Sequence, residues 1–362
     1  MNIVFTGGGT GGHLYPAIAV ARAIKSKYPD SRILFIGNKD GVEASIVPRE
    51  GFDIKFVSCS SFSSNPVKLA KGIVKIAAGI AKTLSIFSEF KPDIVTGSGG
   101  YVSAPVTMAA FLKKIPVVLL EQNTISGKTN RLVGKIAKKI CISFEGSASS
   151  FPKEKTVLTG NPVRDDIIEA SRQDARKRLG IPEDRKCLLI TGASQGARSI
   201  NEAIASKLPS WKDLDMTIIH ITGEKNIEEA KKAAEAVPKG SCLDYRPLPF
   251  MDNIADAYAS CDLAAARAGA TTLAELTARG IPSILIPYPH AAEDHQRKNA
   301  EFIASKGAAL TIEDSEAMEK LGDTIEKLFN DRAGLERMAE CSRKLGRPSA
   351  VFEILKVLEG LK

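Results

Sequence analysis

A glycine-rich turn near the start of the chain ends in a histidine. The run Gly7-Gly-Gly-Thr-Gly-Gly12-His13 follows a short apolar segment, residues 3–6, and precedes an alanine-rich helical pattern at residues 16–24. A strand, a glycine turn and a helix in this order bring backbone N–H groups and a helix N-terminus up to a phosphate. Glycine permits the close approach because it has no Cβ atom and accepts positive φ. The turn therefore predicts a phosphate-binding site.

His13 gives this turn a group that phosphate binding does not require. The positive end of the helix dipole disfavours the imidazolium form and so lowers the pKa of the ring. A neutral imidazole beside a phosphate cradle can accept a proton, which is the chemistry of a general base. A structural cap or a simple phosphate donor is the alternative that the residues leave open.

Two more glycine turns follow predicted strands, and they read Gly97-Ser-Gly-Gly-Tyr101-Val-Ser103 and Thr191-Gly-Ala-Ser-Gln-Gly-Ala197. Ligands of open α/β sheets bind at the carboxyl ends of the strands, so we expect the three turns to converge on one cleft. The first turn formally satisfies G-x-G-x-x-G. However, the second predicted strand ends in Gly37-Asn38 instead of the acid that holds a dinucleotide ribose, which disfavours a nicotinamide or flavin enzyme.

Polar residues that suit a nucleotide sugar follow two later strands. Glu275 lies near the start of a predicted helix, where a carboxylate can hold two ribose hydroxyls; the alternative is a partner for the helix dipole. Gln296 opens another predicted helix and can hydrogen-bond a sugar.

No metal site is expected. His290, Glu293 and His295 miss the H-x-x-E-H spacing by one residue and lack the i, i+4 geometry of a helical zinc pair. Asp213 and Asp215 form a D-x-D pair in a polar stretch before a strand, which we interpret as solvated surface.

Residues 67–87 predict an amphipathic helix with a lysine stripe. Lys68, Lys71, Lys75 and Lys82 fall together on a helical wheel. The opposite side carries apolar residues: Leu69, Ile73, Val74, Ile76, Ile80 and Leu84. Such a helix can lie on an anionic bilayer, although an ordinary helix packed on its sheet fits the pattern equally well. Phe111-Leu-Lys-Lys-Ile115 adds a small apolar and basic patch.

Composition sets the broad class. With 362 residues, 44% hydrophobic and 25% charged, the chain has the composition of a soluble globular protein with two domains. Its six cysteines form no C-x-x-C pair, which predicts reduced thiols in a cytosolic protein. The net charge of +8 favours an anionic partner. Basic repeats interleaved with aromatics are lacking, so nucleic acid is not the expected partner.

The elements that must position these residues alternate between strands and helices. The predicted strands are residues 3–6, 33–36, 54–57, 94–96, 117–120, 139–143, 187–191, 216–222, 262–266 and 283–286. Many are continuous apolar runs, as in parallel strands buried on both faces. A polar break near residues 164–184 separates two similar halves, which predicts two Rossmann-like, doubly wound domains facing across a cleft. A last helix, residues 349–361, can pack on either half.

Taken together, the ordered motifs resemble those of the MurG family of bacterial glycosyltransferases, over essentially the whole chain. The three glycine turns match in order. The other matching segments are Glu121-Gln-Asn123, Gly160-Asn-Pro-Val-Arg164, Arg267-Ala-Gly-Ala-Thr-Thr-Leu-Ala-Glu275 and Asp294-His-Gln296.

The resemblance implies an α/β protein of the GT-B fold. Residues 1–163, joined by the C-terminal helix in 345–362, would bind the acceptor and the membrane, and residues 164–344 would bind the donor. The implied reaction is an inverting, metal-independent transfer of N-acetylglucosamine (GlcNAc) from UDP-GlcNAc to the 4-hydroxyl of the muramoyl sugar of lipid I. The implied location is the cytoplasmic face of the cell membrane, with the protein bound peripherally to its anionic inner leaflet.

The resemblance also implies roles for single residues. Arg164 and Ser194 would hold the diphosphate, Glu275 the ribose and the backbone at Met251 the uracil. Gln296 and the backbone at Ala270 and Thr271 would contact GlcNAc, and His13 would be the base. Thr10, Gly11, Gly12 and Asn123 would line the acceptor and donor-sugar side. From the sequence patterns above, the expected acceptor and membrane contacts are Tyr101, Phe111 and the four lysines of the stripe.

One departure and several alternatives remain. Some members carry a second glutamine where this chain has Arg297, so the sugar contact there is in doubt. Another GT-B enzyme, such as a diacylglycerol glycosyltransferase or a UDP-GlcNAc 2-epimerase, would share the fold. A non-catalytic membrane subunit that only presents a sugar nucleotide is the alternative outside enzymes.

Overall fold

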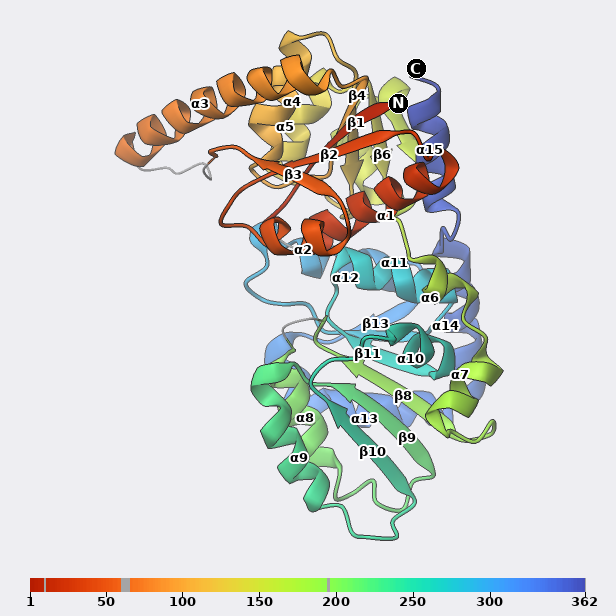
Figure 1. Cartoon of the computed structure of the whole chain (residues 1–362). Coiled ribbons are helices and arrows are strands. Elements are labelled where there is room, and N and C mark those ends of the chain that lie inside the picture. The colour runs from red at the N-terminus through yellow and green to blue at the C-terminus, as the bar shows by residue number, and fades with distance from the viewer. Residues whose placement is uncertain (10, 60–65, 194–195, 362) are drawn as a thin grey trace. The chain divides into compact units, whose positions relative to one another are not determined.

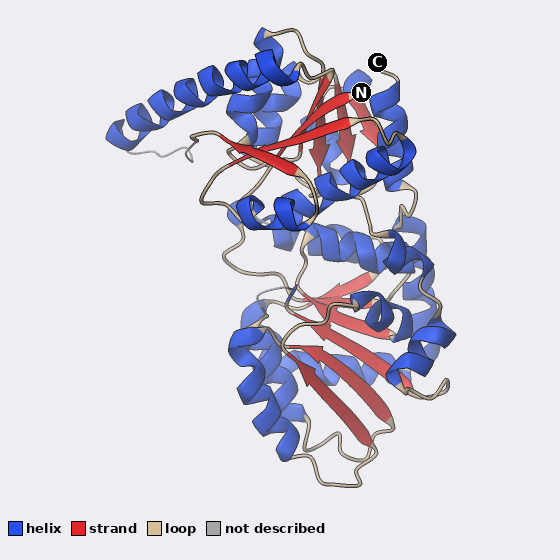
Figure 2. Cartoon of the chain, in the orientation of Figure 1, coloured by secondary structure: helices blue, strands red, loops and turns tan. Residues whose placement is uncertain are grey.

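The computed structural model describes every residue except 10, 60–65, 194–195 and 362. The chain divides into two compact units (Figure 1). Residues 1–162 and 348–362 form the N-terminal unit, and residues 163–347 form the C-terminal unit. In each unit a parallel sheet lies between layers of helices (Figure 2). The predicted α/β class with two doubly wound sheets is confirmed.

Seven parallel strands, counted over the described residues, form the sheet of the N-terminal unit in the order β3-β2-β1-β4-β5-β6-β7. The strands are β1 (Asn2–Thr6), β2 (Arg32–Gly37), β3 (Asp53–Phe56), β4 (Ile94–Gly97), β5 (Val117–Glu121), β6 (Lys139–Ile142) and β7 (Thr156–Leu158). The central strands β1, β4 and β5 are almost wholly buried because helices cover both faces of the sheet.

Helices on the two faces of this sheet build two apolar cores. The helices are α1 (Gly11–Lys27), α2 (Glu43–Arg49), α3 (Pro66–Phe90), α4 (Ser103–Leu112), α5 (Lys128–Ile136) and α15 (Ala350–Glu359), with short 3-10 helices at Glu145–Ser150 and Lys153–Lys155. One core includes Phe87, Val106 and Val133 of α3, α4 and α5. The other joins Leu14 of α1 to Ile354 and Leu358 of α15. The last helix therefore packs on the N-terminal unit.

Six parallel strands form the sheet of the C-terminal unit, in the order β10-β9-β8-β11-β12-β13. They are β8 (Lys186–Thr191), β9 (Met216–Ile221), β10 (Leu243–Leu248), β11 (Leu263–Ala266), β12 (Ser283–Leu285) and β13 (Ala309–Thr311). The α-helices are α6 (Asp165–Glu169), α7 (Arg172–Leu179), α8 (Arg198–Lys207), α9 (Ile227–Glu235), α10 (Ile254–Ser260), α11 (Ala270–Arg279), α12 (His295–Ser305), α13 (Ala317–Asn330) and α14 (Arg332–Leu345). Short 3-10 helices occupy Glu224–Asn226, Ala292–Asp294 and Asp314–Glu316.

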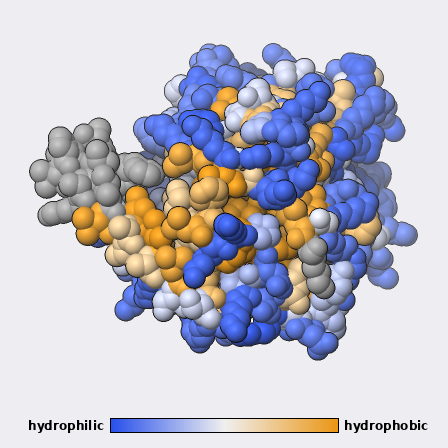
Figure 3. Space-filling view, turned by 90° about the horizontal axis from the view of Figure 1, so that it is seen from above, coloured by the Kyte–Doolittle hydropathy of each residue, from blue (hydrophilic) through white to orange (hydrophobic). Residues whose placement is uncertain are grey.

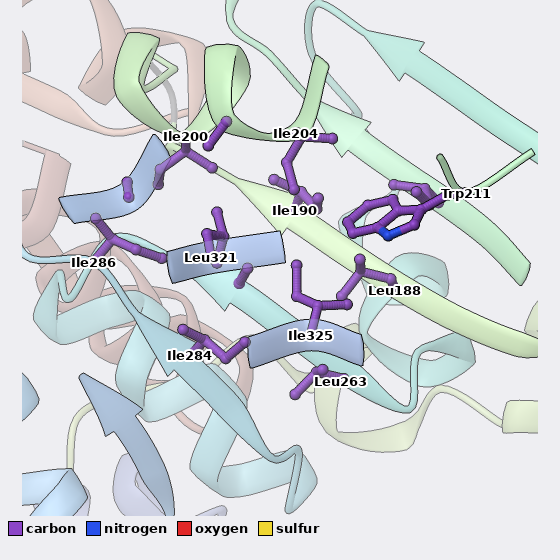
Figure 4. Close-up of a cluster of buried hydrophobic side chains, with 14 of the residues drawn as sticks. Leu188, Ile190, Ile200, Ile204, Trp211, Leu263, Ile284, Ile286, Leu321 and Ile325 are labelled. Carbon is purple, nitrogen blue, oxygen red and sulfur yellow. The ribbon is translucent and has the colours of Figure 1, made fainter. Parts of the chain in front are cut away.

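The core of the C-terminal unit lies between its sheet and the helices α8 and α13. Leu188 and Ile190 of β8 meet Ile204 of α8 and Ile325 of α13 (Figure 4). Trp211 closes one end of this cluster and donates its indole N–H to Glu326, at 2.7 Å from Nε1 to Oε1. A buried indole needs such a partner, since an unpaired N–H would cost free energy in the core.

The ten predicted strands are all present, with ends that shift by one residue or so, but β7, β10 and β13 were missed. All three lie at the edges of their sheets. An edge strand is covered on fewer sides, so it needs no continuous apolar run. β10 even contains Pro247, which is tolerated at an edge because its missing N–H breaks no ladder.

The helix after the first glycine turn begins at Gly11, before the alanine-rich pattern at residues 16–24. Proline favours the first turn of a helix because the amides there have no partner within the helix. Here Pro16 lies in the second turn and removes one hydrogen bond to residue 12. The earlier start places His13 inside the first helical turn.

Each sheet reverses its strand order once, between β1 and β4 in the N-terminal unit and between β8 and β11 in the C-terminal unit. At such a reversal the chain leaves neighbouring strands toward opposite faces of the sheet, which opens a crevice at their carboxyl ends. The first and second glycine turns follow β1 and β4, and the third follows β8. None of the described helices combines the length and apolar character needed to cross a bilayer.

Candidate functional site

The first two glycine turns contact each other at the strand reversal of the N-terminal unit. Thr6 of β1 pairs with Gly97 of β4. The N–H of Ser98 then donates to the carbonyl of Thr6 at 2.8 Å. A Cβ atom at Gly100, whose φ is +77°, would lie 2.4 Å from the carbonyl oxygen of Gly8. The two backbones therefore touch, which only glycine permits. Convergence is confirmed for these two turns.

The buried carboxylate of Glu43 holds the first glycine turn in place through hydrogen bonds. Glu43 of α2 is 1% exposed. It accepts hydrogen bonds from the backbone N–H of Gly9 at 3.2 Å and of Asn38 at 2.9 Å. A Cβ atom at Gly8, Gly37 or Gly41 would collide with it. The missing side chains thus make the room that Glu43 fills, and the carboxylate ties the end of β2 to the turn after β1.

The imidazole of His13 projects from the first turn of α1 and is partly buried. Its Nδ1 lies 3.0 Å from Oε1 of Gln122, which follows β5. Burial lowers the pKa of His13, and hydrogen bonds to Gln122 and to the Ser98 backbone oppose the shift. The sequence predicted this direction from the helix dipole, whereas burial is its largest cause. The ring is therefore neutral near pH 7 and able to accept a proton.

Glu121 organises the segment that carries Gln122 and Asn123. This carboxylate, 1% exposed, accepts from the N–H of Asn123 at 2.9 Å, from Nδ2 of Asn130 at 2.9 Å and from the N–H of Gly127 at 3.3 Å. Burial raises its pKa, and these donors pull the pKa back down. The network fixes the loop after β5 beside the two glycine turns.

The other residues predicted for the N-terminal unit fall into two groups. Gly11 and Gly12 open α1, and the ring of Tyr101 would lie 3.9 Å from a Cβ atom at Gly9, so these join His13 and Asn123 at one edge of the sheet. Thr10 lies outside the described residues. Phe111 is on the last turn of α4, about 12 Å along that helix from its start beside the second glycine turn. It does not belong to the site around His13.

The lysine stripe lies on α3, away from the glycine turns in sequence. Lys75 and Lys82 are exposed, and the side chains of Lys68 and Lys71 lie outside the described part of the structure. The helical wheel placed Val74 on the apolar side opposite the lysines, and Val74 is 68% exposed. α3 (Pro66–Phe90) packs along α4, and its C-terminal part, at Ile86, Phe87 and Phe90, joins the apolar core on the sheet.

The third glycine turn, which lies in the C-terminal unit, is as tightly packed as the first two. A Cβ atom at Gly192 would lie 2.2 Å from the nitrogen of Ala197, and one at Gly196 would lie 1.9 Å from the carbonyl oxygen of Thr222. Ala193 adopts a φ of +58°, which is strained for a residue with a Cβ atom and is a feature of functional loops. Ser194, predicted to hold a phosphate, lies outside the described residues.

Arg267 joins the loops around the reversal of the second sheet. Its guanidinium, largely buried, donates to the carbonyls of Ile286 and Pro287 at 3.2 and 3.1 Å. It also pairs with Asp314 at 2.5 Å and donates to Oγ of Ser199 at 3.2 Å. The loops after β11, β12 and β13 and the start of α8 are thereby held together by one cation.

Glu275 of α11 faces Tyr258 of α10, whose hydroxyl donates to Oε2 at 2.8 Å. Burial raises the pKa of Glu275 to about 7, and the Tyr258 hydrogen bond and the positive charge of Arg164 act against this rise. Arg164 therefore lies close enough to Glu275 to stabilise its charge. These two predicted site residues share one region of the C-terminal unit.

The start of α11 offers unused polar groups. Gly269 caps the helix without a side-chain hydrogen bond, and backbone N–H groups of a first helical turn, which lack partners within the helix, can bind an anion or a hydroxyl. Ala270 is the first helical residue. Next to it, the Oγ1 atom of Thr271 is buried and has no hydrogen-bond partner among the described residues. An orphaned buried hydroxyl is expected where a ligand completes the site.

Gln296 and Arg297 differ in which of their hydrogen-bond donors can reach a ligand. The Oε1 atom of Gln296 accepts from the N–H of Tyr288 at 3.0 Å. The NH2 group of the Gln296 amide is then the part that can donate to a ligand. Arg297 instead pairs with Asp294 and Glu313, at 3.2 and 3.1 Å. The guanidinium that replaces the second glutamine is thus engaged by carboxylates of its own unit.

Three further expectations concern loops of the C-terminal unit. Met251 lies in the loop after β10, at the carboxyl edge of the sheet. Asp213 and Asp215 are exposed at the opposite edge, before β9, and Asp215 pairs with Arg185, so the interpretation as surface is confirmed. Within the described ranges, His, Cys, Asp and Glu side chains form no group of three that could hold a metal ion.

Both halves of the chain match domains of one known protein family. The glycosyltransferase family 28 N-terminal domain matches residues 3–142, and the C-terminal domain of the same family matches residues 187–354. A UDP-N-acetylglucosamine--N-acetylmuramyl-(pentapeptide) pyrophosphoryl-undecaprenol N-acetylglucosamine transferase from Halothermothrix orenii is 41% identical over 99% of this chain and 98% of its own length. The chain belongs to the MurG family. The protein of the same description from Geobacter sulfurreducens is 42% identical over 98% of this chain and 97% of its own.

Solved structures agree with membership of the MurG family. Acinetobacter baumannii MurG superposes with a TM-score of 0.81 at 27% identity, and the match covers 99% of each chain. The UDP-GlcNAc 2-epimerase from Neisseria meningitidis gives 0.66 at 14% identity, over 99% of this chain and all of that one, which shows a shared fold alone. GT-B is therefore the fold of this chain.

Sequence reasoning did not single out several residues that build the site. Gln122 and Arg267 stood inside the matched motifs directly after strands, so the rule that ligands bind at carboxyl ends could have found them. Glu43 and Tyr258 carry no such signal. Each lies on a helix packed beside the site, and only the tertiary fold brings it there.

Gly100 supplies a test of the contact between the glycine turns. Changing Gly100 to Ala should lower the free energy of unfolding, because it adds positive-φ strain and a collision with the Gly8 carbonyl. Gly51 has a φ of +80° and nothing within 4 Å of its Cβ position, so Gly51→Ala should cost only the strain, about 1–2 kcal/mol. Urea denaturation should show a loss for Gly100→Ala larger by about 1–2 kcal/mol or more. Equal losses would mean that the turns are not in contact.

Proposed function

We propose that this chain transfers GlcNAc from UDP-GlcNAc to the 4-hydroxyl of the muramoyl sugar of lipid I, the undecaprenyl-pyrophosphoryl-N-acetylmuramoyl-pentapeptide. The products are lipid II and UDP, and the step belongs to peptidoglycan biosynthesis. The observation that carries the proposal is the full-length likeness, at 36 to 42% identity, to relatives whose names state this transfer.

His13 fits the base of an inverting displacement. Its Nε2 takes the proton from the 4-hydroxyl of the acceptor as that oxygen attacks C1 of GlcNAc from the face opposite the diphosphate. The bond between C1 and the β-phosphate oxygen breaks, and the electron pair leaves with UDP. The product is β-linked. A base whose pKa lies below neutral is in the required form at pH 7, because burial keeps the imidazole uncharged.

The C-terminal unit fits the donor. Glu275 holds the ribose hydroxyls, the loop at Met251 meets the uracil, and Arg164 with the third glycine turn, which includes Ser194, binds the diphosphate. The start of α11, at Ala270 and Thr271, and the amide of Gln296 contact GlcNAc. Backbone N–H groups, helix N-termini and Arg164 can stabilise the charge of departing UDP, so the transfer is proposed to need no metal ion.

We further propose that the N-terminal unit binds the anionic cytoplasmic face of the cell membrane, where lipid I is anchored. Lys75 and Lys82 of α3 are exposed next to Val74, and α4 and α5 expose an apolar group consisting of Met108, Phe111, Leu112 and Leu132. In Figure 3, a view onto this unit, apolar side chains gather in a broad area. Apolar contact combined with lysines is the physical basis of peripheral binding.

The transfer itself is tested with labelled UDP-GlcNAc and a short-chain lipid I analogue in the presence of EDTA. Wild-type protein should form a β-linked lipid II analogue. His13→Ala should bind UDP-GlcNAc normally and transfer roughly 10²–10⁴-fold more slowly, as expected for loss of a general base. Release of UDP without labelled lipid would refute the acceptor, and an unchanged rate for His13→Ala would refute the base. Dependence on added Mg²⁺ would refute the metal-independent step.

The raised pKa of Glu275 predicts a pH-dependent affinity for the donor. Ribose hydroxyls donate to the ionised carboxylate, whose population grows as pH rises through about 7. The Kd for UDP-GlcNAc, measured by calorimetry, should therefore fall by up to about tenfold between pH 6 and pH 8. Glu275→Gln should bind more weakly and lose this dependence. The ribose role would be wrong if that variant kept the wild-type pH profile.

Membrane binding is tested by reversing charge on α3. Lys75→Glu combined with Lys82→Glu should weaken binding to phosphatidylglycerol-containing vesicles by about tenfold or more, since each lysine contributes on the order of 1 kcal/mol. Lys232→Glu with Lys239→Glu, exposed residues of the C-terminal unit, changes net charge equally. Sedimentation with vesicles should show little change for this control. Equal losses in both would contradict a surface on α3.

A further inference from the structure

Gln122 is a buried amide whose two polar ends both have partners. It follows β5 directly and is 1% exposed. Its Nε2 donates to the carbonyl of Leu120 at 3.3 Å, and its Oε1 lies 3.0 Å from Nδ1 of His13. This amide is thus the side chain that meets the imidazole at Nδ1.

The orientation of this amide decides which nitrogen of His13 carries the proton. If the amide were reversed, its oxygen would face the Leu120 carbonyl, and two acceptors would meet without a proton between them. The carbonyl of Gln122 must therefore face the imidazole, and a carbonyl only accepts. Nδ1 must then be the donor, which leaves the lone pair on Nε2.

We propose that Gln122 is a positioning residue that holds the proton of neutral His13 on Nδ1 and so presents Nε2 to the acceptor hydroxyl. The assignment of Nε2 as the proton acceptor rests on the proposed function, whereas the position of the proton in the free enzyme does not. Gln122 itself touches no reacting atom.

The surroundings keep both partners in place. A Cβ atom at Gly99 would lie 2.9 Å from Nδ1 and 3.0 Å from Cε1 of His13, so the ring is pressed against the second glycine turn and has little room to turn over. The loop that begins at Gln122 is held by Glu121, which accepts from Asn123, Gly127 and Asn130. The Ser98 backbone also raises the pKa of His13, so Gln122 acts beside a backbone group that mutation cannot remove.

Charged groups are not what sets the state of this ring. Titratable side chains on the elements around it include Tyr15 on α1, Glu43 on α2, Glu121 on β5 and Lys128 and Arg131 on α5, with Tyr101 in the second glycine turn. Burial lowers the pKa of His13, whereas hydrogen bonding to Gln122 and to the Ser98 backbone raises it. A change at Gln122 should therefore be visible in the titration of His13.

The direct test is ¹⁵N NMR of the histidine side chains in the full-length, substrate-free protein. The chain has only four histidines, and His13→Ala identifies the signal of His13. Wild-type protein should show a protonated Nδ1 and an unprotonated Nε2. Gln122→Met keeps the length of the side chain but removes the acceptor, and it should move a measurable fraction of His13 to the opposite tautomer. Gln122→Glu, which keeps an acceptor, should retain the wild-type pattern.

The pH profile of transfer gives a readout that a merely structural role would not move. Gln122→Glu places a carboxylate at Nδ1 and should shift the acidic limb, where His13 becomes protonated, to higher pH. Gln122→Met should shift it to lower pH. The Met variant should also lose about tenfold or more in kcat, within the roughly 10²–10⁴-fold that a base contributes, at unchanged KM for UDP-GlcNAc. Ser147→Ala removes a buried hydrogen bond elsewhere in the unit and should leave the profile as it is.

Two outcomes overturn the proposal. If His13 keeps its proton on Nδ1 in Gln122→Met, other surroundings of the ring suffice and Gln122 does not hold the tautomer. If wild-type protein carries the proton on Nε2, the amide orientation argued from Leu120 is wrong. A changed tautomer without any change in transfer would instead refute His13 as the base and leave the role of Gln122 in setting the tautomer intact.

Discussion

Everything at the edge of the N-terminal sheet depends on two backbones touching at the strand reversal. The turns that contain Gly8 and Gly100 leave neighbouring strands toward opposite faces of the sheet. Their backbones meet so closely that a Cβ atom at Gly100 would collide with the carbonyl of Gly8. This close approach brings the first turn of α1 against the second glycine turn. His13 is thereby pressed onto Gly99 and placed beside the end of β5. The glycine residues are needed here for contact between turns as much as for the approach of a ligand.

The carboxylates of Glu43, Glu121 and Glu275 differ in the number of hydrogen-bond donors around them. This difference decides whether each one holds the fold or can bind a ligand. Glu43 and Glu121 receive several N–H donors from glycine turns and loops, so they act as fixed braces. Glu275 receives one hydroxyl from Tyr258, and burial raises its pKa to about 7. A carboxylate with unused hydrogen-bonding capacity is suited to bind a ligand, because the ligand supplies the donors that the protein withholds.

The two units share the same strand order but carry different groups at its reversal. Each reverses between its first and fourth strand, and each places a glycine turn there. In the N-terminal unit the neighbouring loops present a neutral imidazole and its amide partner. In the C-terminal unit the cation of Arg267 gathers the loops after β11, β12 and β13. At the start of α11 the Thr271 hydroxyl has no partner within the part of the chain that the structure describes. One unit thus suits proton transfer, and the other suits an anionic sugar nucleotide.

The sequence by itself determined the central strands, the glycine turns and the position of His13 at a helix start, because these depend on local apolar runs and on residues without a Cβ atom. It did not reveal the edge strands β7, β10 and β13, whose partial exposure leaves no continuous apolar run. The exposure of Val74 was also decided by packing. Above all, only the tertiary structure brings Glu43, Gln122 and Tyr258 to the groups they control, since hydrogen bonds between residues far apart in the chain leave no local pattern.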